Sequence, residues 1–140
     1  MTEALPSLVV VAGLGQLALA AVSLAIPRVL GWREETARLG PLTREVFWTY
    51  AAYIWGTNVA MGLLSCLAPD ALLDGTPLAR AVCGYVTTYW GARLVLQLAA
   101  FGRHAPPGRA FRLAEAALVA LFSFLVLVYG AAVLASLAAP

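Results

Sequence analysis

A single arginine lies well inside an apolar segment of this sequence, and its side chain is the first candidate for chemistry. Arg93 falls within the run from Leu78 to Phe101, fifteen residues after its start and eight before its end. Eight residues of α-helix place the guanidinium about 12 Å from the nearer end of the segment. In lipid, a charge at that depth costs about 2.5–3.5 kcal/mol on insertion scales, so it needs a carboxylate, polar groups or water beside it.

Polar side chains recur at every fourth residue along the same segment: Tyr85, Tyr89, Arg93 and Gln97. On a helix this spacing drifts by about 40° per step, so the line of side chains wraps only slowly around the helix. Together with Gln16, Tyr53 and Thr57 of earlier apolar segments, they are candidates to line a cavity with a polar floor and aromatic walls. There the guanidinium would hold the anionic or carbonyl head of a lipophilic molecule, such as a quinone-like or fatty-acid-like ligand.

Glu115 gives the same arginine a second interpretation. It lies near the start of the last apolar segment, which follows the Pro106-Pro107-Gly108 turn, at a depth that two long side chains can bridge. A bidentate pair of Arg93 with Glu115 would be an internal clasp that fixes the register of two helices. Glu45, at the start of the second apolar segment, is the other candidate partner. Because a carboxylate is available, we favour the clasp and keep the ligand site as its alternative.

Several kinds of catalytic and cofactor site are missing from the sequence. The only histidine, His104, falls in a predicted loop, and lysine is absent. These two facts exclude a haem held between two histidines and Schiff-base chemistry. The sequence also has no Ser-His-acid set, no repeated di-iron ligands and no phosphate-binding glycine loop. We therefore expect no cofactor, no metal ion and no catalytic activity.

The composition indicates that lipid is the solvent for most of the chain. Hydrophobic residues make up 62% of the 140 residues and charged residues 11%, against roughly 45–50% and 25% in soluble domains. A soluble fold of this length has too little interior to hide so much apolar side chain. The formal net charge of +2 is too small for a nucleic-acid footprint. The sequence therefore predicts one integral membrane domain, residues 1–140.

Four apolar segments are long enough to cross a bilayer as helices: residues 6–27, 44–67, 77–101 and 110–137. Twenty residues span about 30 Å, the thickness of the hydrocarbon. Pro27 interrupts the first segment, Thr43 is a candidate N-cap for the second, and Thr76-Pro77 suits the start of the third. The first segment lacks a basic leader, so we interpret it as a retained helix. The predicted fold is all-α, a four-transmembrane-helix bundle with up-down-up-down topology.

Smaller patterns concern packing. Small and polar residues recur along one face of the first segment (Gly13, Gln16, Ala20, Ser23) and of the last (Ala116, Ala120, Ser123, Gly130). Such faces let neighbouring helices approach closely.

The charged stretch around Trp32 and Leu39 predicts a short helix at the level of the lipid headgroups. Cys66 and Cys83 fall near the same end of their segments, and we interpret them as isolated thiols rather than a disulfide.

The arginine counts predict an orientation. The first connection carries four arginines (Arg28, Arg33, Arg38, Arg44), the third carries three (Arg103, Arg109, Arg112), and the second carries only Arg80. With four crossings, the first and third connections lie on the same side. The positive-inside rule therefore makes both cytoplasmic and leaves the N- and C-termini outside. The expected location is the inner (plasma) membrane of a bacterium.

These observations favour a small, non-catalytic subunit or scaffold that packs against a larger membrane protein or against copies of itself. Near-absence of soluble loops and the small-residue faces are the reasons. The alternative function is binding or transport of a lipophilic anionic or quinone-like molecule in a cavity centred on Arg93. A third hypothesis, a proton-coupled exporter, is weaker because Glu115 lies near the end of its helix rather than at the midplane.

Overall fold

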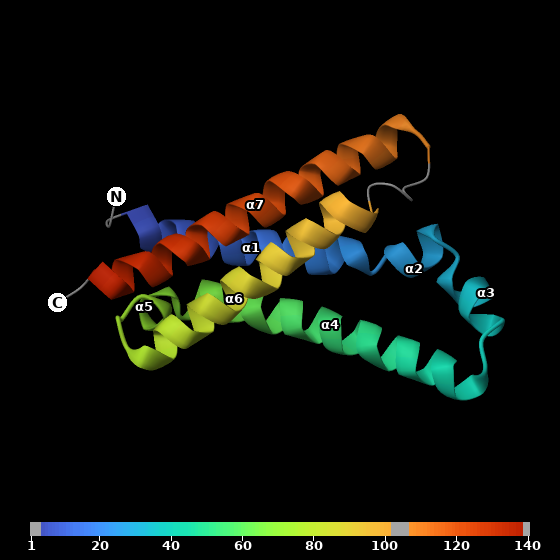
Figure 1. Ribbon diagram of the computed structural model, residues 1–140, viewed down its shortest axis with the longest axis horizontal. Coiled ribbons are helices and arrows are strands. Elements are labelled where there is room, and N and C mark those ends of the chain that lie inside the picture. Colours follow the sequence, from blue (N-terminus) through green and yellow to red (C-terminus); the bar gives the residue numbers. More distant parts are fainter. Residues whose placement is uncertain (1–3, 102–106, 139–140) are drawn as a thin grey trace.

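Four long helices carry the fold of the computed structural model, which describes residues 4–101 and 107–138 (Figure 1). They are α1 (Leu5–Ser23), α4 (Pro41–Leu67), α6 (Pro77–Leu96) and α7 (Arg109–Ala138). Successive long helices run in opposite directions, and the two ends of the chain lie at the same end of the molecule (Figure 1). The described part of the chain contains helices and turns and no strand. The all-α prediction is therefore confirmed.

Short helices fill the connections. The segments α2 (Ile26–Val29) and α3 (Trp32–Ala37) follow α1, and α5 (Pro69–Leu72) follows α4. The short helix predicted around Trp32 is present as α3. Five residues of π-helix, η2 (Gln97–Phe101), extend α6. His104 and the first residue of the turn predicted at 106–108 lie in residues 102–106, outside the described residues.

Two helix ends differ from the sequence prediction because of proline. The first helix stops at Ser23, four residues before Pro27, since proline has no N–H for the Ser23 carbonyl and its ring clashes with that carbonyl. Near this end of α1, the carbonyl of Ala20 accepts hydrogen bonds from Trp55 Nε1 of α4 at 3.0 Å and from Ser23 Oγ at 2.8 Å. The second long helix begins at Pro41 rather than near Arg44, because a proline in the first helical turn leaves no bond unmade.

The start of α6 follows the prediction. Its N-cap is Thr76, whose Oγ1 accepts a hydrogen bond from the backbone N–H of Ala79 at 3.2 Å. Arg80, in the first turn of α6, binds the end of α7, at the open end of the α6–α7 hairpin. Its Nε donates to Ser136 Oγ at 3.2 Å and its Nη2 donates to the Ser136 carbonyl at 3.1 Å. The end of α7 is therefore fastened to the beginning of α6.

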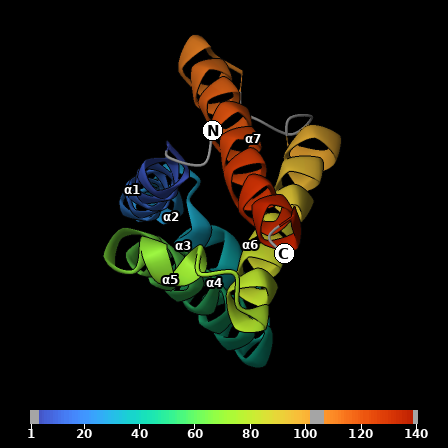
Figure 2. The same cartoon turned by 90° about the vertical axis from the view of Figure 1, so that its left-hand side faces the viewer.

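The long helices pack as two antiparallel hairpins. Helix α1 lies along α4, helix α6 lies along α7, and the hairpins meet chiefly through α1 and α7 (Figure 2). By contrast, α4 and α6 touch only sparingly and diverge toward the end of the molecule that carries α3 (Figure 1). The bundle is therefore open on the side of α4 and α6.

Glycines set the distance between α1 and α4. A Cβ atom built on Gly13 would lie 2.8 Å from the Gly62 carbonyl oxygen and 2.8 Å from Cys66 Sγ. One built on Gly62 would lie 2.9 Å from the side chain of Leu17. The small-residue face predicted on the first segment thus lets another helix approach closely, as expected. The helix that packs on it is α4 of the same chain.

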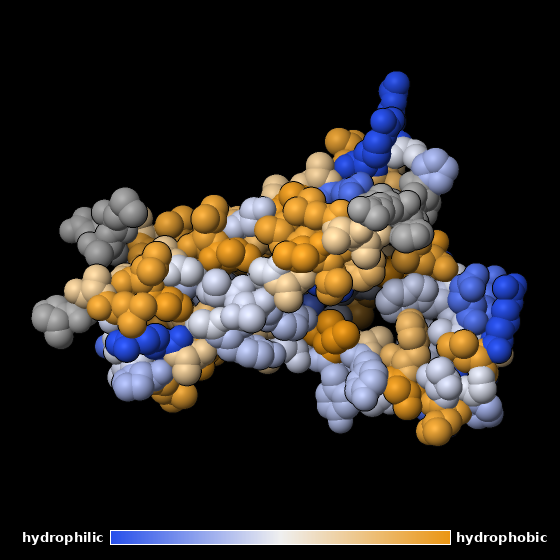
Figure 3. Space-filling model, viewed as in Figure 1, coloured by the Kyte–Doolittle hydropathy of each residue, from blue (hydrophilic) through white to orange (hydrophobic). Residues whose placement is uncertain are grey.

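Two helical stretches, Leu5–Val29 and Arg109–Ala138, are long and apolar enough to cross a membrane. The other two long helices carry more tyrosine, tryptophan and polar side chains, which lower their mean hydropathy. Large apolar side chains nevertheless cover much of the surface (Figure 3). The predicted crossings are thus supported for two of the four long helices.

Candidate functional site

A chain of hydrogen bonds at the centre of the molecule joins all four long helices. Trp90 Nε1 of α6 donates to Gln16 Oε1 of α1 at 3.1 Å, and Gln16 Nε2 donates to Tyr129 Oη of α7 at 2.7 Å. The Tyr129 hydroxyl shares a short hydrogen bond with Ser65 Oγ of α4, which also donates to the Met61 carbonyl at 2.8 Å. All four polar side chains are buried. We call this set the central network.

The chemistry of these groups fixes the direction of the network. An indole N–H can only donate, so we assign the Gln16 oxygen to Trp90 and the Gln16 amide nitrogen to Tyr129. The single Ser65 proton goes to the Met61 carbonyl, so Tyr129 donates to Ser65. The second amide hydrogen of Gln16 reaches the carbonyl of its own helix at 3.5 Å. Every donor therefore has an acceptor, and the network links the four long helices.

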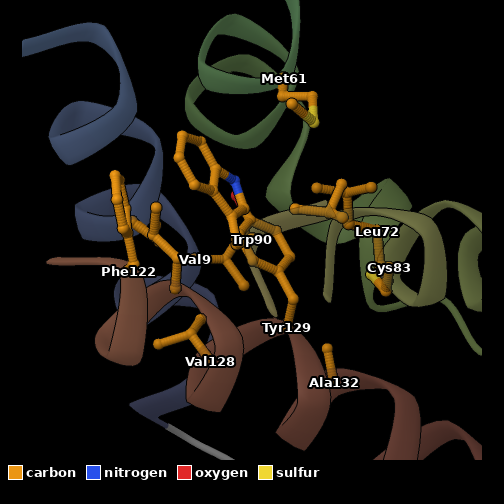
Figure 4. Packing of buried hydrophobic residues seen from close by; sticks show 12 residues of the cluster. Val9, Met61, Leu72, Cys83, Trp90, Phe122, Val128, Tyr129 and Ala132 are labelled. Atoms are coloured by element: carbon orange, nitrogen blue, oxygen red, sulfur yellow. The ribbon is translucent and has the colours of Figure 1, made fainter. Parts of the chain in front are cut away.

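Apolar side chains surround the central network on the side of α7 (Figure 4). The rings of Trp90 and Phe122 stack with centroids 5.2 Å apart and an interplanar angle of 28°. Val9 and Leu125 are fully buried beside them. This packing excludes water from the hydrogen bonds and strengthens them. The core therefore lies where the two hairpins meet.

Arg93 does not form the predicted clasp. Within the described part of the chain its guanidinium has no ion pair with Glu115 or Glu45, and its Cζ instead lies 5.1 Å from the centroid of the Phe101 ring. From Arg93 to Phe101 a regular α-helix would turn by about 800°. The two side chains would then point about 80° apart around the helix axis. The wider π-helical turn of η2 takes up about one extra residue and brings Phe101 back over Arg93.

The other predicted site residues do not line one cavity. Tyr53 and Tyr85 point outward and are 69% and 57% exposed. Thr57 Oγ1 donates to the Tyr53 carbonyl of its own helix at 2.8 Å. Tyr89 Oη donates to Asn58 Oδ1 at 2.9 Å and so bridges α6 to α4. The cavity expected around Arg93 is therefore not assembled from these residues.

Two more of the predicted residues lie apart from one another. Gln97 is buried in η2, whereas Gln16 belongs to the central network. Sequence reasoning assigned Gln16 to the ligand cavity and did not single out Trp90, Ser65 or Tyr129. A signal was present, because a glutamine, a serine and a tyrosine inside apolar helical segments of lipid-spanning length each require a partner.

The cysteines are free. Cys83 Sγ is buried and donates to the Leu72 carbonyl at 3.4 Å, and Cys66 Sγ, which is half-buried, donates to the Val10 carbonyl at 3.8 Å. The interpretation as isolated thiols is confirmed. In residues 4–101 and 107–138 no three His, Cys, Asp or Glu side chains gather in a way that could hold a metal ion. Comparisons with protein-family models, with curated proteins and with solved structures return no match for this chain.

Proposed function

We propose that this chain crosses a membrane four times, with α1, α4, α6 and α7, and serves as a non-catalytic subunit that binds another membrane protein or a second copy of itself. The observation that carries the proposal is the exposure of Tyr53 at the middle of α4.

Lipid exposure of the long helices supports the membrane part of the proposal. Only 28% of the most apolar 18-residue window is buried in each of the stretches Leu5–Val29 and Arg109–Ala138. A core helix of a soluble protein would be mostly buried. The helices α4 and α6 also turn large apolar side chains outward, for example Leu67 at 80% and Leu78 at 74% exposed. With 27 residues, α4 is about 40 Å long, more than a bilayer core requires.

Exposed tyrosines support a protein partner. Tyr53 lies twelve residues after the start of α4 and fourteen before its end, and the described residues offer its hydroxyl no hydrogen bond. A hydroxyl moved from water into hydrocarbon without a partner loses roughly 2–7 kcal/mol. Tyr50 and Ile54 of α4 and Tyr85 of α6 are exposed as well. A protein that covers these four residues, which we call the α4–α6 face, would satisfy the hydroxyls.

The open bundle leaves the part of this face next to α6 accessible, whereas Tyr53, about 140° around α4 from Asn58, lies on the outer side of the helix. Tyr89 and Asn58 form the hydrogen bond between α4 and α6, and beyond it the two helices diverge (Figure 1). Ile54 lies one helical turn before Asn58, on the diverging side. Arg93 lies one turn after Tyr89 on that side and has no carboxylate partner in the described chain. A partner helix that carries an acidic residue would therefore match the α4–α6 face in both shape and charge.

Photo-crosslinking from the α4–α6 face tests the proposal. A photoreactive phenylalanine derivative is placed at Tyr53 in the full chain in bacterial membranes, and at Leu127 of α7 as a control of similar exposure. We expect a protein adduct from Tyr53 and only lipid adducts from Leu127. If Tyr53 yields no protein adduct and the chain purified in mild detergent runs as a monomer without a copurifying protein, the proposal is wrong.

The arginine distribution supports a bacterial inner membrane with the first and third connections in the cytoplasm. Arg28, Arg33, Arg38 and Arg44 are all exposed in or beside the first connection. At the other end, Arg80 is engaged with Ser136. Free cations of the described chain thus gather at one end, as the positive-inside rule requires. Reporter fusions at the C-terminus should be active only when the reporter functions outside the cytoplasm.

A second candidate function is the binding of a lipophilic anion at Arg93. It is favoured by half-buried Arg93, whose guanidinium lies over the ring of Phe101 and has no carboxylate partner in the described chain. An anionic or carbonyl head could supply the missing counter-charge. Arg93→Gln and Arg93→Lys separate this function from subunit association. Loss of a bound amphiphile in the glutamine variant, with retention in the lysine variant and unchanged crosslinking from Tyr53, would support the anion site.

A further inference from the structure

The corner between α3 and α4 is hollowed on two sides. One open hollow of about 310 Å³ is lined by Arg33, Thr36, Ala37, Arg44 and Trp48. A neighbouring hollow of about 500 Å³ is lined by Leu30, Trp32, Glu35, Thr36, Leu39 and Phe47. Because Thr36 lines both, the two hollows adjoin. A hollow lined by two arginines thus lies beside a larger hollow without a basic residue, at an end of the molecule where hydrophilic and hydrophobic residues lie together (Figure 3).

Charge distinguishes the smaller hollow. Its lining contains two guanidinium groups, from Arg33 and Arg44, and no carboxylate. Neither arginine forms an ion pair within the residues that the structure describes. Arg44 lies in the first turn of α4, where the helix dipole disfavours a cation and favours an anion. Its position is therefore explained better by an anion in the hollow than by the stability of α4.

An aromatic cluster forms the boundary between the two hollows. The rings of Trp32, Phe47 and Trp48 meet edge to face, with centroids 5.2 to 6.2 Å apart. The indole N–H of Trp48 has no acceptor among the described residues. Tryptophans with an apolar ring and a free N–H are typical of the interface between hydrocarbon and headgroups. The cluster therefore marks the level at which a lipid headgroup lies.

We infer that this corner binds an anionic phospholipid. The phosphodiester lies between Arg33 and Arg44, the Trp48 indole donates to a headgroup oxygen, and an acyl chain follows Leu30, Leu39 and Phe47. Basic hollows at the cytoplasmic side of transmembrane helices recognise lipid phosphates in this way. Arginine forks suit the phosphate, and two of them give charge-assisted hydrogen bonds. The only acid in either lining, Glu35, lines the larger hollow and not the one that contains Arg33 and Arg44.

The inference rests on the proposed membrane location but not on the proposed partner. It is tested on the full chain in detergent, titrated with phosphatidylglycerol or with phosphatidylcholine of the same acyl chains, with bound lipid counted by native mass spectrometry. The test variant is Arg33→Gln/Arg44→Gln. The control, Arg28→Gln/Arg38→Gln, removes the same charge from the same connection outside both hollows. Circular dichroism checks that both variants keep their helix content.

We expect one tightly held phosphatidylglycerol in the wild type and in the control, and at least about tenfold weaker binding in the test variant, the loss that follows from one charge-assisted hydrogen bond. Phosphatidylcholine, in which a choline cation offsets the phosphate, should bind the wild type more weakly than phosphatidylglycerol does. Trp48→Phe, which removes the N–H and keeps a smaller aromatic ring, should weaken phosphatidylglycerol binding by a few fold. Inorganic phosphate and glycerol phosphate at the same concentration should not displace the lipid.

Three results overturn the inference: equal loss in the control and test variants, no preference for phosphatidylglycerol, or displacement by inorganic phosphate, which would indicate a site for a soluble anion. Failure of the proposed function is seen separately. A chain that stays soluble without detergent contradicts the membrane location, and a missing protein adduct at Tyr53 contradicts the partner while leaving the lipid titration valid.

Discussion

Gln16 and Tyr129 are 113 positions apart in the sequence, yet Gln16 Nε2 donates to Tyr129 Oη at 2.7 Å in the centre of the molecule. The bond joins the α1–α4 hairpin to the α6–α7 hairpin. Trp90 and Ser65 extend it to α6 and α4. The arrangement of the long helices is thus fixed by polar groups as well as by apolar packing, which in lipid contributes less to association than it does in water.

Tyr129→Phe tests the central network. The change leaves the Gln16 amide and Ser65 without their shared partner in a buried site, so we expect a loss of about 1–3 kcal/mol of unfolding free energy. The measurement is reversible unfolding in mixed micelles. Tyr53→Phe is the matched control, because it removes the same hydroxyl from an exposed position without a hydrogen bond. Equal effects of the two substitutions would contradict a stabilising network.

Gly13→Ala tests the close approach of α1 and α4. The new methyl would lie 2.8 Å from the Gly62 carbonyl oxygen, so the helices must separate, at a cost of about 1–3 kcal/mol. Thermal unfolding in detergent measures the change. At Gly56 of α4 an added Cβ meets nothing within 4 Å. Gly56→Ala should therefore be neutral or stabilising by up to about 1 kcal/mol, through helix propensity. Destabilisation of similar size at both positions would refute the packing argument.

Arg93→Met tests whether Arg93 has an internal partner. Without a carboxylate, the guanidinium costs about 2.5–3.5 kcal/mol in lipid, so the methionine variant should insert and fold at least as well as the wild type. A buried clasp would give the opposite result, a loss of about 3–5 kcal/mol, because a carboxylate would remain unpaired. Membrane insertion and detergent unfolding are measured beside Arg112→Met, an exposed control. Marked instability of Arg93→Met alone would restore the clasp with Glu115.

Asp74 gives a pH dependence outside the long helices. The backbone N–H of Thr76 donates to Asp74 Oδ1 at 2.9 Å, and this bond and the Thr76 hydroxyl hold the pKa of the carboxyl below its usual 3.8. A lowered pKa in the folded state means that the carboxylate stabilises the fold above its unfolded pKa and loses that contribution as pH falls through the folded value. Wild type and Asp74→Ala should therefore differ in melting temperature by a constant amount above pH about 4 and converge below it. A difference that grows on acidification would contradict the sign.

The helices could be predicted from the sequence, and their ends only in part. Length and apolarity place all four long helices, and Thr76-Pro77 fixes the start of α6 because the cap and the proline act locally. Pro27 and Pro41 shift their helix ends by a few residues, since a proline acts four residues upstream when it ends a helix and within the first turn when it begins one.

The candidate site was harder to predict for a geometric reason. Sequence position gives the depth of Arg93 and Glu115 along their helices, but it does not give the rotation of one helix against the other. The π-helical turn at Gln97–Phe101 changes that rotation further and has no simple sequence signal. Tyr129 was missed because it is an isolated polar residue in a long apolar helix, and its partner lies in another hairpin.

The one-way order of donors in the central network has a consequence for biogenesis. An α1–α4 hairpin released alone into the bilayer would keep the Gln16 oxygen unpaired, and an α6–α7 hairpin alone would keep the Trp90 indole N–H unpaired. Each half thus carries what the other lacks: Gln16 and Ser65 of the first half offer two acceptors and one donor, and Trp90 and Tyr129 of the second offer two donors and one acceptor. The halves should therefore find each other soon after translation, and co-expressed as separate polypeptides they should reassemble in the same membrane.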